Sequence, residues 1–165
     1  MTAEAARRVT VAGLALTASA FAAACAGAGP SGGSDAEQRI QTVISEAHSG
    51  LATARREVIH DAAGWSRLWA EIHAGRSPAP ELPAVDFARE MLIAVATGTR
   101  PSGGFSIQVT GVTTHGDTLE VAVLERCPES DAIVTLALTQ PVEVVRVAKL
   151  AQTPTFRDTR TGACR

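Results

Sequence analysis

The sequence lacks the features that mark several common classes of protein. Fifteen Lys and Arg residues against seventeen Asp and Glu residues give a formal charge of −2, so there is no basic surface for nucleic acid. The sequence also has no basic cluster that could attract anionic lipid. No apolar run reaches the roughly 18 residues of a membrane-spanning helix. We therefore expect no nucleic-acid partner and no membrane contact beyond an attached lipid.

Patterns typical of catalytic and metal sites are missing as well. The four histidines follow neither an HxH nor an HExxH spacing; they are His48, His60, His73 and His115. Ser102 stands in RPSGGF, without the GxSxG frame of a nucleophilic serine and without a base nearby in sequence. The sequence therefore predicts a protein that is not an enzyme and has no catalytic residue, metal or cofactor.

The N-terminus has the plan of a secretory signal peptide. Arg7 and Arg8 precede the Ala-rich stretch 9–24, which polar residues interrupt and which ends in small side chains. This stretch is too short and too polar to span a bilayer, so cleavage is the better interpretation. We predict a lipoprotein signal peptide over residues 1–24.

Cys25 is the expected site of lipid attachment. Small residues before it and a Gly/Ser-rich segment after it resemble the lipobox of bacterial lipoproteins, in which this cysteine is diacylated. Ala22 stands where that motif usually has Leu, and the alternative is an ordinary signal peptide cut near Ala24 or Ala26. Since two acyl chains give stable anchoring, we expect an exported protein held at the membrane of the bacterial cell envelope by lipidated Cys25.

The remaining chain divides into a tether and one domain. Residues 25–38 are mostly Gly, Ser, Ala and Pro, which cannot bury enough apolar surface to fold, so we predict a lipidated, flexible tether. Residues 39–165 have the length of a single domain with one modest core.

The central stretch of this domain runs from residue 86 to residue 109. Met91–Ala96 is a continuous apolar run, typical of a strand buried on both faces. Phe105–Val109 alternates apolar and polar residues and predicts a strand with one solvated face. The segment 98–104 contains Pro and paired glycines, so we expect a tight, solvent-facing turn between adjacent strands.

One helix precedes this stretch. Asp61 fits an N-cap, and apolar residues follow at helical spacing: Trp65, Leu68, Trp69 and Ile72. The two tryptophans could stack on a ligand, but on one apolar helix face they are more often part of a core, and we expect packing.

Strand patterns occupy most of the rest of the domain. The predicted strands are 40–46 and 55–59 before the helix, and 109–112, 119–123, 133–138 and 142–147 after the central stretch. His115–Asp117 predicts a hairpin connection, and residues 125–131 a polar turn. We therefore predict an α+β fold, with a single, mostly antiparallel sheet of about seven strands and one principal helix packed on it.

Two cysteines remain after lipidation, Cys127 and Cys164. In an exported chain such a pair favours a disulfide, which would tie the polar C-terminal tail to the sheet. A reactive Cys127 thiol, or two free inert thiols, are the alternatives.

Three segments together resemble a known family. VIHDAAGWSRLW at residues 58–69, PAVDFAREMLIAVATGTRPSGGFSIQV at residues 83–109 and LTQPVEVVRVAK at residues 138–149 are similar to the C-terminal domain of PrcB, the lipoprotein partner of a bacterial surface protease complex. Phe105 stands where the family usually has Tyr, and Gln140 where Ser is common. The resemblance implies a non-enzymatic, lipid-anchored module of the cell envelope that binds or stabilises a protease or another envelope protein.

The loop Arg100–Phe105 is the predicted binding element. Gly103 and Gly104 would let the backbone approach a partner closely, while Pro101 would restrict the loop beside Ser102. The loop is also similar to the Gly-rich loops of chagasin-type inhibitors, so a peptidase inhibitor that presents Pro101 to Phe105 is the alternative function. A purely structural turn is the other interpretation of the two glycines.

Overall fold

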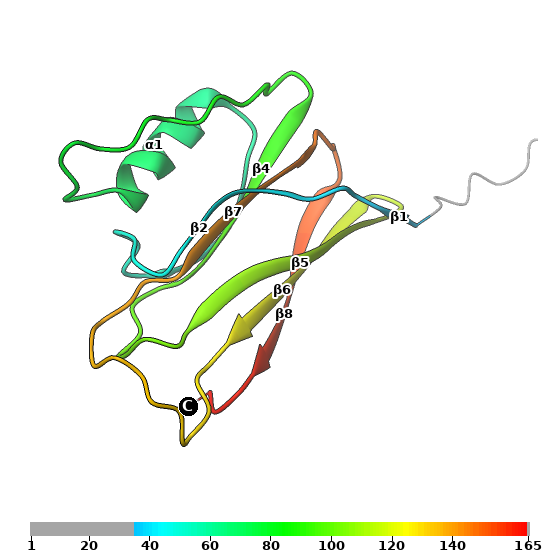
Figure 1. Ribbon diagram of the computed structural model, residues 1–165. Coiled ribbons are helices and arrows are strands. Elements are labelled where there is room, and N and C mark those ends of the chain that lie inside the picture. Colours follow the sequence, from blue (N-terminus) through cyan, green and yellow to red (C-terminus); the bar gives the residue numbers. More distant parts are fainter. Residues whose placement is uncertain (1–34, 165) are drawn as a thin grey trace, which may run out of the picture. The chain divides into compact units, whose positions relative to one another are not determined.

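The computed structural model describes residues 35–164 (Figure 1). The predicted signal peptide, Cys25 and most of the predicted tether lie outside these residues. The described elements, in chain order, are β1 Ala36–Glu37, β2 Gln41–Glu46, β3 Ala54–Ile59, α1 Ala62–Ile72, β4 Glu90–Thr97, β5 Ser106–His115, β6 Thr118–Arg126, β7 Val142–Ala148 and β8 Thr153–Thr161. No helix in this part of the chain is long and apolar enough to cross a membrane.

The strands form two sheets, so the prediction of a single sheet is wrong. One sheet has four strands in the order β1-β5-β6-β8, and the other has four in the order β2-β7-β4-β3. All neighbours are antiparallel except β6 and β8, which are parallel. The two sheets face each other, and α1 covers the outer face of the second sheet (Figure 1). The combination of strands with one principal helix is as expected, but the helix lies on only one of two sheets.

β4 lies inside the second sheet, which is packed between α1 and the first sheet, and both faces of β4 are buried as predicted. Its odd-numbered apolar residues pack against the β5–β6 sheet, and they are Met91, Ile93 and Val95. Its even-numbered residues pack against α1, and they are Leu92, Ala94 and Ala96. Side chains of a strand alternate between the faces of a sheet, so a continuous apolar run serves two cores.

The helix forms where the sequence predicts it. The Asp61 carboxylate accepts a hydrogen bond from the Gly64 N–H at 2.7 Å and caps the first turn. Trp65 is fully buried, and its indole Nε1 donates to the Pro83 carbonyl at 2.9 Å. Trp69 is half-buried and donates to the Pro80 carbonyl at 3.0 Å. Both tryptophans are therefore packing residues, which hold the proline-rich loop against the helix.

The β5–β6 hairpin is also as predicted. The strands are joined by Gly116 and Asp117, and Gly116 has a φ of 56°. A register shift between Val109 and Gly111 bends β5. At this bulge the carboxylate of Glu143 on β7 accepts the Val109 N–H at 2.6 Å, so one buried side chain joins the two sheets.

Three other features differ from the expectations. Residues 133–138 do not form a strand, and β8 forms in the polar C-terminal tail, where no strand was predicted. β8 is held mainly by parallel pairing with β6 along its whole length, since Phe156 is its one partly buried side chain and packs against the core. β1 lies within the segment expected to be tether, and pairs Ala36 with Thr114 at the hairpin end of β5.

Candidate binding surface

Two loops meet at the end of the sandwich opposite the β5–β6 hairpin. The first is the β4–β5 connection, residues 98–105, which we call the glycine loop. The second is the β6–β7 connection, residues 127–141, which we call the apolar loop; together the two loops form the tip (Figure 1). Because β4 and β5 belong to different sheets, the glycine loop crosses between sheets. The prediction of a turn between adjacent strands is therefore wrong.

The glycine loop is bound along the apolar loop by main-chain hydrogen bonds. Arg100 N–H donates to the Thr139 carbonyl at 2.7 Å, and Thr139 N–H donates back to the Arg100 carbonyl at 3.0 Å. Gly103 N–H donates to the Thr135 carbonyl at 2.9 Å, and the Thr139 hydroxyl donates to the Ser102 carbonyl at 2.8 Å. These contacts fix the conformation of both loops relative to each other.

Both glycines of the predicted binding loop face the chain's own side chains. A Cβ at Gly103 would lie 2.5 Å from Thr135 Oγ1. A Cβ at Gly104, which has a φ of 84°, would lie 2.9 Å from Val134 Cγ1 and 3.0 Å from Pro128 Cβ. Close intramolecular packing and a positive φ thus account for the two glycines without a partner. Pro101 is exposed at the outer turn of the loop.

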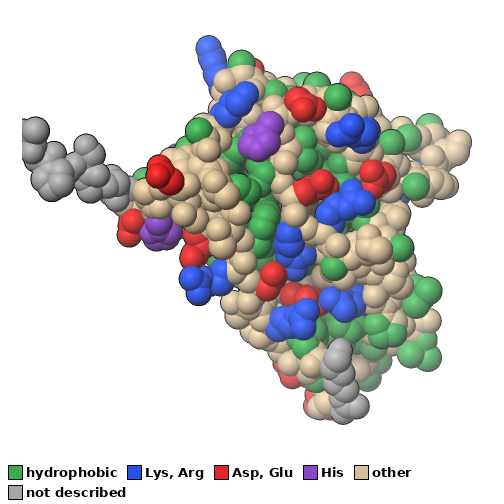
Figure 2. Space-filling model, turned by 180° about the vertical axis from the view of Figure 1, so that it is seen from behind, with side chains coloured by type: hydrophobic (Ala, Val, Ile, Leu, Met, Phe, Trp, Pro, Cys, Tyr) green, Lys and Arg blue, Asp and Glu red, His purple; other side chains and the backbone are tan. Residues whose placement is uncertain are grey.

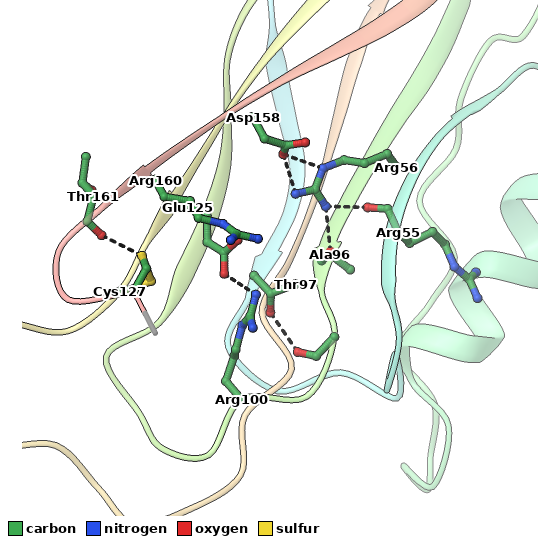
Figure 3. Close-up of polar contacts among 12 residues, drawn as sticks. Arg55, Arg56, Ala96, Thr97, Arg100, Glu125, Cys127, Asp158, Arg160 and Thr161 are labelled. Carbon is green, nitrogen blue, oxygen red and sulfur yellow. Dashed lines mark hydrogen bonds and ion pairs between the residues drawn. A yellow bond between two sulfur atoms is a disulfide. The ribbon is translucent and has the colours of Figure 1, made fainter.

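A buried carboxylate fixes the glycine loop to the first sheet. The Glu125 side chain is 4% exposed. One of its carboxylate oxygens contacts the guanidinium of Arg100, and the other contacts the guanidinium of Arg160 at 3.2 Å. Figure 3 shows Arg100 and Arg160 on either side of this carboxylate. Arg100 also lies over the Phe105 ring, 5.7 Å from its centroid. The cluster joins the glycine loop to β6 and β8.

This cluster was not predicted from the sequence. Residues 125–131 were predicted to be a polar turn, but β6 continues to Arg126 and Glu125 points inward. The signal was present in the alternation of Leu119, Val121 and Val123, since the next residue on that face is Glu125. A glutamate in the inward register of a strand indicates a buried ion pair.

The disulfide supports the start of the apolar loop. Cys127 and Cys164 are bonded, as the sequence predicts, with Cα atoms 5.2 Å apart. Cys127 N–H also donates to the Thr161 carbonyl at 2.8 Å. The chain can turn here because Gly162 has a φ of 83°, and a Cβ at this position would collide with the Cys127 carbonyl oxygen.

The apolar loop exposes large hydrophobic side chains. Ile133 and Leu136 are fully accessible, and Leu138 is 63% exposed. The loop lies at the lower left of Figure 1, and hydrophobic side chains accordingly gather toward the lower right of the reverse view in Figure 2. The strand predicted for 133–138 does not form, and these residues lie in the connection between β6 and β7, which belong to different sheets.

The fold is a small, disulfide-linked β-sandwich with one helix on an outer face and an apolar tip formed by two inter-sheet loops. Residues 91–148 match the family model described as PrcB C-terminal. The match runs from β4 to β7 and contains both loops of the tip, whereas the helical motif of residues 58–69 lies outside it. No curated protein and no solved structure matches the chain.

Proposed function

We propose that the chain is a lipid-anchored, non-enzymatic module of the bacterial cell envelope that binds and stabilises a protease or another envelope protein. The observation that carries the proposal is the tip, where fully exposed Ile133 and Leu136 stand on a loop fixed by main-chain pairing and a disulfide. Exposed apolar clusters on a supported surface are typical of protein interaction sites. The match of residues 91–148 to the PrcB C-terminal family model is consistent with association with a protease complex.

If the chain is anchored through Cys25, the N-terminal strand sets how the described domain is held. β1 pairs with Thr113 and Thr114 near the hairpin end of β5, whereas the glycine loop enters the opposite end of β5 at Ser106. A chain held through its N-terminus would therefore present the tip on the side away from the point of attachment. This placement leaves the tip free for a protein partner.

Lipid attachment is tested by replacing the cysteine. The parent chain should incorporate labelled fatty acid and fractionate with membranes, and Cys25→Ser should do neither. A Cys25→Ser protein that retains the label and the membrane fraction would contradict the anchor.

Partner binding is tested by affinity capture of the full-length lipoprotein from its own cells after crosslinking. We expect one envelope protein to be recovered reproducibly, and its half-life in the cell to fall when the gene for this chain is deleted. Recovery of no protein above the level seen with an unrelated lipoprotein would overturn the proposed function.

We propose this function in preference to peptidase inhibition. Pro101 and Gly104 are exposed, but a Cβ at Gly103 would collide with Thr135 and one at Gly104 with Val134, so packing within the chain accounts for both glycines without a protease cleft. Assays against a panel of proteases separate the two functions: an inhibitor lowers substrate turnover, whereas a binding module changes the lifetime of its partner.

A further inference from the structure

The geometry points to the kind of partner that the tip takes. We infer that residues 133–138 of the apolar loop bind an extended, strand-forming apolar segment of a partner protein, flanked by Lys or Arg, through main-chain pairing. This inference rests on the proposed function and narrows it to one surface and one chemistry.

Side-chain exposure is the first support. Within six residues, Ile133, Leu136 and Leu138 all present large apolar side chains to solvent. Single exposed apolar residues are common on proteins, but three of this size within six residues place an unusual amount of apolar surface on one loop. Burial of this surface against apolar side chains would favour association.

The unpaired backbone is the second support. Among the hydrogen bonds of residues 35–164, none is donated by the six consecutive amides of residues 133–138. Only the Thr135 carbonyl is used, by Gly103 N–H. The sequence IVTLAL has the composition of a strand, although the backbone bends at residues 136 and 137, so a segment with strand propensity keeps unpaired donors. Because successive N–H groups of a strand point to opposite edges, an added strand would pair with the alternate amides on one edge, as in recognition by β-augmentation.

The rigidity of the loop is the third support. The disulfide at Cys127 holds one end, and the reciprocal hydrogen bonds between Arg100 and Thr139 hold the other. A loop that is already fixed loses little conformational entropy when a partner binds.

Charge defines the flanks of the bound segment. Glu129 and Asp131 are exposed at the N-terminal end of the apolar stretch, and neither forms an ion pair within the described part of the chain. Arg100 and Arg160 are already paired with Glu125. Two free carboxylates beside an apolar strand favour a partner with basic residues next to its own apolar run.

The same charges disfavour a second copy of this chain as the partner. In antiparallel pairing, the neutral end of one apolar loop, Thr139 and Gln140, would face Glu129 and Asp131 of the other copy. In parallel pairing, like charges would lie side by side. Neither arrangement gives the carboxylates an opposite charge.

Site-specific photocrosslinking of the full-length lipoprotein in its own cells tests the inference. The photoreactive residue p-benzoylphenylalanine replaces Leu136 at the tip, or, as a matched control, Leu82, an exposed leucine on the loop beside the helix. We expect a protein crosslink from position 136 and none from position 82. Mass spectrometry should locate the crosslink in an apolar, extended segment with Lys or Arg beside it.

Charge reversal provides the second arm. Glu129→Lys with Asp131→Lys should lower the crosslink yield from position 136 by at least about tenfold, since basic flanks would then meet basic side chains. The matched control Glu81→Lys, also an exposed glutamate, should leave the yield unchanged. Thermal unfolding shows that each variant is folded.

Several results would overturn the inference. One is a crosslink from position 136 to a second copy of this chain, to lipid, or to a helical or acidic segment. Another is the absence of any crosslink from position 136. A third is a crosslink yield that is unchanged by the charge reversal. Partner capture together with a crosslink only from position 82 would retain the proposed function and reject this surface. Failure to capture any partner would reject the proposed function itself.

Discussion

The pair formed by Arg100 and Glu125 allows a quantitative test of how the tip is held. Arg100→Met removes one of the two cations from a carboxylate that is 4% exposed. Breaking a buried pair by removing one partner costs about 3 to 5 kcal/mol, because the other charge stays buried. Arg160 still contacts Glu125 at 3.2 Å. We therefore expect a loss at or below the lower limit, about 2 to 3 kcal/mol.

The double variant Arg100→Met, Glu125→Leu separates the pair from the packing around it. With both charges replaced by apolar side chains, no unpaired charge is left in the interior, and the loss should fall below about 1 kcal/mol. Together with the single variant Glu125→Leu, a double-mutant cycle then isolates the interaction energy of the pair. Urea denaturation followed by the fluorescence of Trp65 and Trp69 measures each free energy of unfolding, and an unchanged denaturant slope shows that the unfolding transitions are comparable.

An exposed ion pair on the same sheet is the control. Arg157 contacts Glu120 at 2.9 Å, with the arginine side chain 70% exposed, so Arg157→Met should leave the denaturation midpoint nearly unchanged. The reasoning is refuted if Arg100→Met behaves like Arg157→Met, or if the double variant loses as much stability as the two single variants combined.

Three further predictions concern stability. Removal of the disulfide between Cys127 and Cys164 should cost about 3 to 4 kcal/mol, and mass spectrometry of the unreduced protein should show no free thiol in this domain. Trp65→Ala should lose about 3 to 5 kcal/mol and the half-buried Trp69→Ala clearly less, so an unfolding midpoint for Trp65→Ala equal to that of the parent would contradict the helix packing. Burial lowers the pKa of His73, whose two ring nitrogens have no hydrogen-bond partner in residues 35–164. In the unfolded chain this histidine has the ordinary pKa of 6.5, so below this pH the unfolded chain binds a proton more readily than the folded one. The free energy of unfolding is therefore highest above pH 6.5 and falls as the pH drops below that value. In denaturation measured at several pH values, the free energy of unfolding of His73→Phe should fall less with acid than that of the parent. An equal fall in both proteins would show that His73 does not cause the loss of stability in acid.

Local patterns of the sequence determined most of the individual elements. The apolar run of β4, the N-cap and apolar face of α1, and the turn at Gly116 each depend on residues close together in the chain. The disulfide was also predictable, because two cysteines remained in an exported chain. These features follow from backbone geometry and side-chain chemistry that act over a few residues.

Only the tertiary structure decided how the elements are arranged. The pattern of apolar residues shows which side of a strand is buried but not what covers it. The patterns of β4 and β7 therefore fit a single sheet covered by a helix as well as two sheets packed face to face. For the same reason the polar β8 forms through pairing with β6, while residues 133–138, with a stronger strand pattern, pair with no strand of either sheet and remain an exposed loop. Pairing partners come from distant parts of the chain, and the interactions that select them are not encoded in any local segment.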